Sequence, residues 1–188
     1  MKETVRALSA AVGRPDDRHL GKFRGLVTDV DDPNQAGRLR ALVPEVLADV
    51  PTGWALPCAP YAGKATGLWA IPPVGTGVWI EFEAGDPSRP VWTGCWWGDG
   101  EAPAESVKQL VIQTPGGHVV RIDDDAGTVE IGEAGGGKIA MASDSITLES
   151  NGAKVVLDSK GVELSAGGKK ILVGSASVSI NDGAMEVT

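Results

Sequence analysis

The stretch GGKIAMASDSITLESN, residues 136–151, decides the fold of the second half of the chain, because it returns twice in altered form. Sixteen residues later the chain reads GAKVVLDSKGVELSAG (152–167), and after sixteen more it reads GKKILVGSASVSINDG (168–183). A lysine holds the third position of all three copies and a serine holds the eighth. A period kept this closely indicates a stack of similar structural units.

Within each copy, aliphatic residues come in pairs that are two positions apart, which is the spacing of residues on one face of a β-strand. From Ile139 onward, successive pairs begin seven or nine residues apart, so the unit is an octad that is doubled into sixteen residues. Each octad is therefore predicted to be a short strand followed by a turn. The predicted core consists of Ile139, Met141, Ile146, Leu148, Val155, Leu157, Val162, Leu164, Ile171, Val173, Val178 and Ile180.

A single strand that buries two aliphatic side chains cannot offset the entropy lost when it is ordered. Stacked strands can do so, because neighbouring strands share a continuous core. Two architectures fit this requirement. One is a monomeric two-layer roll with sixteen residues per turn, and the other is a prism in which several chains wind together and successive octads lie on successive faces. The pattern alone leaves both open.

The aromatic residues divide the chain into two parts. All six tryptophans precede residue 98, and no Trp, Tyr or Phe occurs after residue 100. Two kinds of core imply two domains, and the Gly-, Pro- and acid-rich sequence GDGEAPAE between them is typical of a linker. The predicted organisation is an N-terminal arm (1–20) with a short helix over Thr4–Ala11, a barrel (21–98), a linker (99–110) and the repeat region (111–188).

Residues 21–97 contain six short segments that are predicted to be strands. In one of them Val78, Ile80 and Phe82 alternate with Trp79 and Glu81, as in a half-buried strand. The number and shortness of the segments favour a small closed barrel, with most of the tryptophans in its core. The six segments are KFRGLVTDV, RLRALVP, WALPCAP, GLWAIP, GVWIEFE and PVWTGCWW.

Composition narrows the functional classes. The formal net charge of −8 argues against nucleic-acid binding, which needs clustered Lys and Arg. No run of apolar residues is long enough to span a membrane, and the N-terminus does not read as a signal peptide, so we expect synthesis in the cytoplasm. Cys58 and Cys95 have no metal-ligand spacing and are expected to be buried free thiols.

Motifs for catalysis or cofactor binding are weak. The sequence GEAGGGK (132–138) has the spacing of a phosphate-binding loop, but Ile139 stands where the magnesium-binding Ser or Thr belongs. The acidic run Asp123–Asp125 is interpreted as a solvated turn, and His19 and His118 belong to no ligand cluster. No nucleophile elbow and no supported carboxylate pair is present. We therefore expect no enzymatic activity, no cofactor and no metal.

The first hundred residues resemble a known family through motifs that occur in order between residues 23 and 98. These motifs are DP…GR, PYAG, IPPVG and GDPSRPVWTG. They are similar to the OB-fold domain of baseplate assembly protein V, the spike of contractile phage tails, and of the spikes of type VI secretion and extracellular contractile injection systems. The residues that carry the resemblance are Asp32, Pro33, Gly37, Arg38, Gly75, Gly85, Asp86, Pro87, Pro90 and Gly94.

The resemblance implies an all-β chain in which an OB-fold barrel precedes a C-terminal intertwined trimeric β-helix, a β-prism needle. It also implies a structural, membrane-puncturing central spike that is assembled into a phage or phage tail-like particle. The implied partners are two further copies of the chain, baseplate hub and tube proteins and, transiently, the target envelope.

Two features of some relatives are missing, namely a lysozyme domain and a His-x-His tip that binds iron. The ending MEVT predicts a blunt column with Met185 and Val187 at its end, where a separate PAAR-type tip protein would dock. The alternative to the spike is an OB-fold module on a β-solenoid stalk, which binds glycans or oligonucleotides on an aromatic face that includes Trp97.

Overall fold

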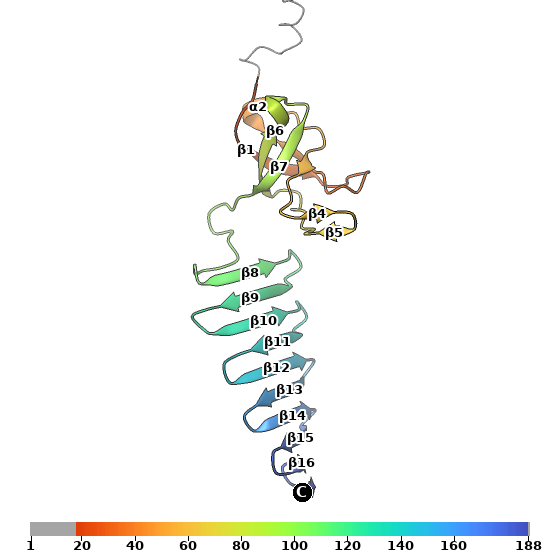
Figure 1. The fold of residues 1–188 in the computed structure, drawn as a ribbon, viewed down its shortest axis with the longest axis vertical. Coiled ribbons are helices and arrows are strands. Elements are labelled where there is room, and N and C mark those ends of the chain that lie inside the picture. Colours follow the sequence, from red (N-terminus) through yellow and green to blue (C-terminus); the bar gives the residue numbers. More distant parts are fainter. Residues whose placement is uncertain (1–17, 188) are drawn as a thin grey trace, which may run out of the picture. The chain divides into compact units, whose positions relative to one another are not determined.

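The structure is a computed structural model that describes residues 18–187, so the predicted helix Thr4–Ala11 lies outside the described residues. The chain divides into two compact units, residues 1–101 and 102–188. Strands dominate both units, which confirms the all-β class (Figure 1).

The first unit is built on a five-stranded sheet with the order β2-β1-β6-β7-β3. The pairs within β2-β1-β6-β7 are antiparallel, whereas β3 runs parallel to β7. Its strands are β1 (Phe23–Asp29), β2 (Arg40–Leu42), β3 (Leu56–Pro57), β6 (Gly77–Phe82) and β7 (Pro90–Cys95). The unit also holds the hairpin of β4 (Ala62–Gly63) and β5 (Thr66–Gly67), the short helix α2 (Pro44–Leu47) and the 3-10 turn η2 (Glu83–Gly85).

A short run of hydrogen bonds next to β2 and β3 closes this sheet into a barrel. Leu39 and Ala55 exchange backbone hydrogen bonds of 3.2 and 2.8 Å. The backbone N–H of Thr52 donates to the carbonyl of Ala41 at 2.8 Å, and the N–H of Ala41 donates to the Thr52 hydroxyl at 3.1 Å. Thr52 is buried, and these bonds satisfy its polar groups inside the barrel.

The barrel core matches the alternation of the sequence in β6, where Val78, Ile80 and Phe82 are buried. The expectation that most tryptophans lie in the core is wrong, because Trp92 is the only buried one and both Trp69 and Trp97 are 69% exposed. The complete buried apolar set is Val27, Leu39, Ala41, Val43, Ala55, Val78, Ile80, Phe82 and Trp92.

Two further expectations for this unit differ from the structure. The segment GLWAIP forms no strand beyond Gly67, the last residue of β5, because the prolines at its end lack the N–H that a ladder needs and restrict the residues before them. Cys58 and Cys95 are free, as expected, but both are exposed rather than buried.

The second unit is one antiparallel sheet in which each strand pairs with the next strand along the chain, in the order β8 to β17 (Figure 1). Its first five strands are β8 (Gln109–Gln113), β9 (Val119–Asp123), β10 (Thr128–Gly132), β11 (Lys138–Met141) and β12 (Ser145–Ser150). The remaining five are β13 (Ala153–Asp158), β14 (Gly161–Ala166), β15 (Lys169–Gly174), β16 (Val178–Ile180) and β17 (Met185–Val187).

Because consecutive strands pair, successive octads of one chain stay in one sheet, which differs from the expected winding of octads onto successive faces. Tight turns explain this difference. Asn151 and Gly152 between β12 and β13 have φ of 51° and 77°, and Gly167 and Gly168 between β14 and β15 have φ of 55° and 74°. Two residues with positive φ form a hairpin turn, which returns the chain beside the strand it has just left.

Replacing Gly77 should destabilise the barrel. A Cβ at this buried position would lie 2.5 Å from the ring of Trp96, so Gly77→Ala must displace that ring. We expect the free energy of unfolding to fall by about 1–3 kcal/mol. Tryptophan fluorescence during urea unfolding measures this, because all six tryptophans belong to the first unit.

Gly53→Ala is the matched control, because a Cβ there would meet no atom within 4 Å. Its free energy of unfolding should change by less than about 0.5 kcal/mol. Equal effects of the two substitutions would show that contact with Trp96 does not restrict position 77.

Candidate functional site

Two unbroken columns of aliphatic side chains run along one face of the second unit's sheet. Cross-strand register creates them, because Ile139 stands opposite Leu148 and Met141 stands opposite Ile146, and the same correspondence continues from strand to strand. Column 1 consists of Ile112, Val120, Ile131, Ile139, Leu148, Val155, Leu164, Ile171, Ile180 and Met185. Column 2 consists of Leu110, Ile122, Val129, Met141, Ile146, Leu157, Val162, Val173, Val178 and Val187.

We call this surface the aliphatic face. It contains all twelve residues predicted as core, together with Met185 and Val187, and it brings them into two straight rows. The predicted core left out the pairs on the first three strands, although they show the same spacing of two: Leu110 and Ile112, Val120 and Ile122, and Val129 and Ile131.

The single chain leaves the aliphatic face open to solvent. Ile139 and Leu157, both in the middle of the sheet, are 40% exposed, and no described residue after 101 is buried. Contiguous apolar surface of this extent is unusual on a soluble monomer and marks an interaction site. The sheet therefore presents a surface that requires a cover from outside the chain.

The opposite face is polar over most of its length. On this face Lys138 pairs with Glu130 at 3.5 Å, and Lys170 pairs with Glu163 at 3.7 Å. Val156, next to Leu157 on β13, is an apolar exception on this face. The contrast between the two faces indicates which one is covered and which one meets water.

A groove of about 960 Å³ runs along column 1 and does not extend to column 2. It is lined by Ile139, Leu148 and Leu164 of column 1 and by residues at the strand ends, such as Ala153 and Lys169. The aliphatic face is therefore hollowed along one side only.

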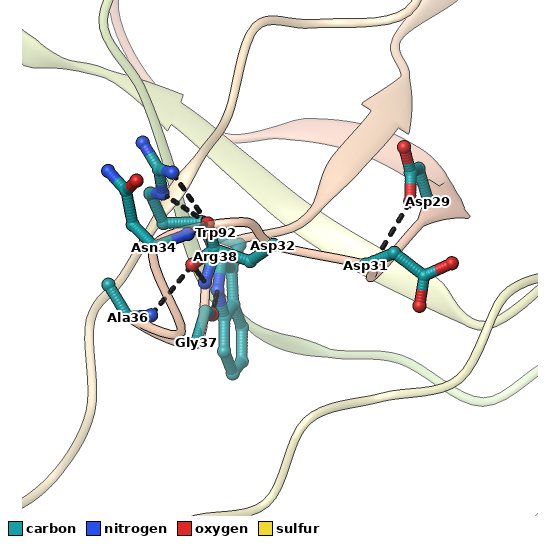
Figure 2. Close-up of polar contacts among 8 residues, drawn as sticks. All are labelled: Asp29, Asp31, Asp32, Asn34, Ala36, Gly37, Arg38 and Trp92. Atoms are coloured by element: carbon teal, nitrogen blue, oxygen red, sulfur yellow. Dashed lines mark hydrogen bonds and ion pairs between the residues drawn. The ribbon is translucent and has the colours of Figure 1, made fainter.

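In the barrel, the motif residues Asp32, Gly37 and Arg38 meet in the loop between β1 and β2, as Figure 2 shows. The Asp32 carboxylate accepts hydrogen bonds from the backbone N–H groups of Asn34 at 3.0 Å, Ala36 at 2.7 Å and Arg38 at 3.2 Å. It also accepts bonds from the Arg38 guanidinium, through Nε at 2.9 Å and Nη2 at 2.5 Å (Figure 2). One carboxylate thus organises the whole loop.

This carboxylate is held in its ionised form. The Arg38 guanidinium and the three backbone donors keep the pKa of Asp32 far below its ordinary value, although burial acts in the opposite direction. Only 5% of the Asp32 side chain is exposed. The Trp92 indole N–H donates to the carbonyl of Gly37 at 3.1 Å, which ties the loop to the barrel core (Figure 2).

A second motif loop, between β6 and β7, holds Gly85, Asp86, Pro87 and Pro90. Asp86 accepts hydrogen bonds from both the backbone N–H and the hydroxyl of Ser88, at 2.9 and 2.8 Å, and these bonds lower its pKa. Gly85 has φ of 79°, and a Cβ there would lie 2.9 Å from Arg18. The loop therefore depends on glycine at this position.

The remaining motif residues are spread over the barrel. Pro33 follows Asp32 in the β1–β2 loop. The N–H of Gly75 donates to the carbonyl of Val27 at 2.8 Å, and Gly94 lies on β7 opposite Trp79. These positions shape the barrel and form no chemical cluster with the others.

No group of three or more His, Cys, Asp or Glu side chains able to hold a metal ion occurs among residues 18–187. Within the same residues, no helix has the length and apolar character needed to cross a membrane.

Two sequence-family models match the chain. Residues 23–97 match the model described as the type VI secretion system/phage-baseplate injector OB domain. Residues 109–186 match the model described as the phage baseplate V C-terminal trimerisation domain. Together these matches cover the barrel and all ten strands of the second unit except the last residue of β17. A comparison with curated proteins found no match.

The Asp32 contacts predict an acid-sensitive barrel. Because the folded-state pKa is depressed, the ionised carboxylate stabilises the fold at pH values above its unfolded pKa of about 4, and this contribution is lost as the pH falls further. Asp32→Asn should lower the melting temperature at pH 7 and flatten its dependence on pH below about 4. Thermal melts followed by tryptophan fluorescence measure both effects.

The neighbouring change Asp31→Asn is the control, because no ion pair involves the Asp31 carboxylate in the described part of the chain. It should leave the melting temperature at pH 7 nearly unchanged. If Asp32→Asn behaved in the same way, the carboxylate would not organise the loop.

Proposed function

The chain belongs to the phage baseplate V family, and we propose that three copies of it form the central spike of a contractile injection machine. The family assigns the protein to the baseplate of a phage or tail-like particle and its second unit to self-association as a trimer. The finer proposal is that the spike is structural, that it seats on the baseplate hub, and that it pierces the target envelope when the sheath contracts.

The observation that carries the proposal is the uncovered aliphatic face. Three sheets placed around a common axis, with these faces inward, would remove both columns of every copy from water. A slender interior suits residues such as Val155, Leu157 and Val162, since none of the column residues is aromatic. Burying apolar surface contributes about 25 cal/mol per Å², so assembly supplies the stability that the single sheet lacks.

The same architecture supports a mechanical role. Neighbouring strands lie about 4.8 Å apart, so the ten strands β8 to β17 stack to a height of roughly 45 Å. Backbone hydrogen bonds of an antiparallel sheet run along the direction of stacking, so an axial load is carried by the ladder and by the packed core. A narrow, stiff column of this kind concentrates force on a small area of envelope.

The barrel would provide the attachment to the rest of the machine. Its closed core and the loop organised by Asp32 make it a rigid body, which suits a part that transmits load from hub and tube proteins. In this proposal the function of the barrel lies in the contacts that its loops make, and not in a catalytic centre.

The end of the column would receive a separate tip protein. Met185 and Val187 on β17, the last strand of the sheet, are 57% and 54% exposed, because only one neighbouring strand adjoins them. In a trimer, three copies of this pair form a small apolar end surface. A PAAR-type protein with an apolar base is the partner that fits it.

A charge on the aliphatic face should break the trimer. In Leu157→Lys, threefold symmetry places three ammonium groups together inside the column, and each buried unpaired charge costs several kcal/mol. We expect the mass of the purified protein, measured by light scattering, to fall from three times 19.4 kDa toward that of one chain or to aggregates.

Val156→Lys is the matched control, because Val156 is the preceding residue on β13 and lies on the opposite face. This variant should remain trimeric. A wild-type protein that is a well-folded monomer in dilute solution would overturn the proposal, as would equal tolerance of lysine at both positions.

The proposed tip contact is tested with Met185→Asp/Val187→Asp. Three pairs of carboxylates would replace the apolar end surface, so capture of a purified PAAR-type protein on the immobilised spike should be lost. Ser175→Asp, in the loop between β15 and β16, should leave capture intact. Unchanged capture by the double variant would place the tip contact elsewhere.

A further inference from the structure

The sheet of the second unit has two lateral margins made of turns, and the two margins differ in charge. Margin A adjoins column 1 and consists of residues 114–118, 132–138, 149–154, 165–170 and 181–184. Margin B adjoins column 2 and consists of residues 123–128, 142–145, 158–161 and 174–177.

Margin A carries four lysines against three carboxylates, whereas margin B carries five aspartates against one lysine. The excess is therefore one positive charge on margin A and four negative charges on margin B, of which one, Asp125, is paired with Lys108 just before β8. The two margins of this one sheet therefore differ in net charge, and solvation alone does not require such a difference.

Several of these charges form no ion pair within the described part of the chain, although Asp144 and Asp158 accept hydrogen bonds from Ser145 and from the backbone of Lys160, and Lys154 stands opposite Glu149 on β12. Among residues 18–187, no ion pair involves Lys154 or Lys169 on margin A, or Asp144 or Asp158 on margin B. All four residues are exposed. They are available to charges on another molecule.

The margins also differ in shape. The groove of about 960 Å³ follows margin A, with Ala153 and Lys169 among its lining residues, and it contains no residue of margin B. Its floor is column 1, so it needs apolar side chains to fill it. Column 2 lies beside margin B and offers such side chains, including Leu157 and Val162.

We propose that margin B of one copy seats in the groove along margin A of the next copy, with the aspartates of B facing the lysines of A. This inference rests on the proposed trimer. A threefold axis along the stacking direction keeps all copies the same way up, so margin A of each copy meets margin B of its neighbour, and the contact is heterologous and closes after three copies.

The sixteen-residue repeat gives the two sets of charges the same spacing along the stack of strands. Lys138, Lys154 and Lys170 occur once per hairpin on margin A, and Asp144 and Asp158 occur in successive turns of margin B. Both series therefore recur about every 10 Å, which is two strand spacings. A copy placed upside down would bring margin B against margin B, where the aspartates of the two copies repel, so the pattern selects the parallel trimer.

The test compares two substitutions of identical chemistry. Lys169→Glu reverses a charge on margin A at a position opposite Ala166, where no carboxylate of the same chain stands across the strand pair, and Lys160→Glu reverses the one lysine of margin B. Both change the charge of the trimer by the same amount. The readout is the urea concentration at which half of the trimer has dissociated, measured by light scattering in low salt.

We expect Lys169→Glu to lower this midpoint and Lys160→Glu to leave it unchanged or raise it. Sodium chloride at about 0.5 M should remove most of the difference, because it screens exposed charges. The double change Lys154→Glu/Lys169→Glu and the double change Asp144→Lys/Asp158→Lys should each lower the midpoint, and their combination in one chain should restore it.

Equal shifts for Lys169→Glu and Lys160→Glu would overturn the inference, because only total charge would then matter. Failure of the fourfold variant to recover would also overturn it. Neither result would contradict the proposed trimer. A wild-type chain that is monomeric without urea would instead overturn the proposed function on which the inference rests.

Discussion

The rest of this structure depends on one constraint, which is that the chain cannot cover its own two columns of aliphatic side chains. Each octad contributes two such residues, and antiparallel register sets them in line from β8 to β17. A sheet that buries none of its described residues has no core of its own, so ordering it and covering it must occur together. Folding of the second unit is thereby coupled to association.

The two units are stabilised in different ways. The barrel is closed by its own hydrogen bonds, buries Val27, Ile80 and Trp92, and fixes its main loop with the ionised carboxylate of Asp32. The second unit has regular turns and no aromatic residue, and it relies on repetition instead. The absence of aromatic residues is consistent with an interior shared by three sheets, where bulk would be repeated threefold.

Much of the second unit could be predicted from the sequence, because a spacing of two fixes which side chains share a strand face. That reasoning placed Ile139 to Ile180 on one face. It did not give the strand pairing, because the octad spacing is the same for a wound prism and for a meander. The hairpin turns decide between them, and Asn151-Gly152 was the local signal. In the barrel, Trp69 shows the limit of composition, since an aromatic residue beside prolines can remain on an exposed loop.

The two-residue turns also mean that the height of the stacked sheet changes in steps of one hairpin. Because β12 and β13 are joined at Asn151-Gly152, and β14 and β15 at Gly167-Gly168, sixteen residues add one hairpin and return the chain to the same margin. Duplicating or removing one such unit would change the height of the column by about 10 Å while every aliphatic side chain kept its face. The length of the sheet can therefore change by whole repeats, whereas an insertion of one residue within a strand would turn the following side chains outward.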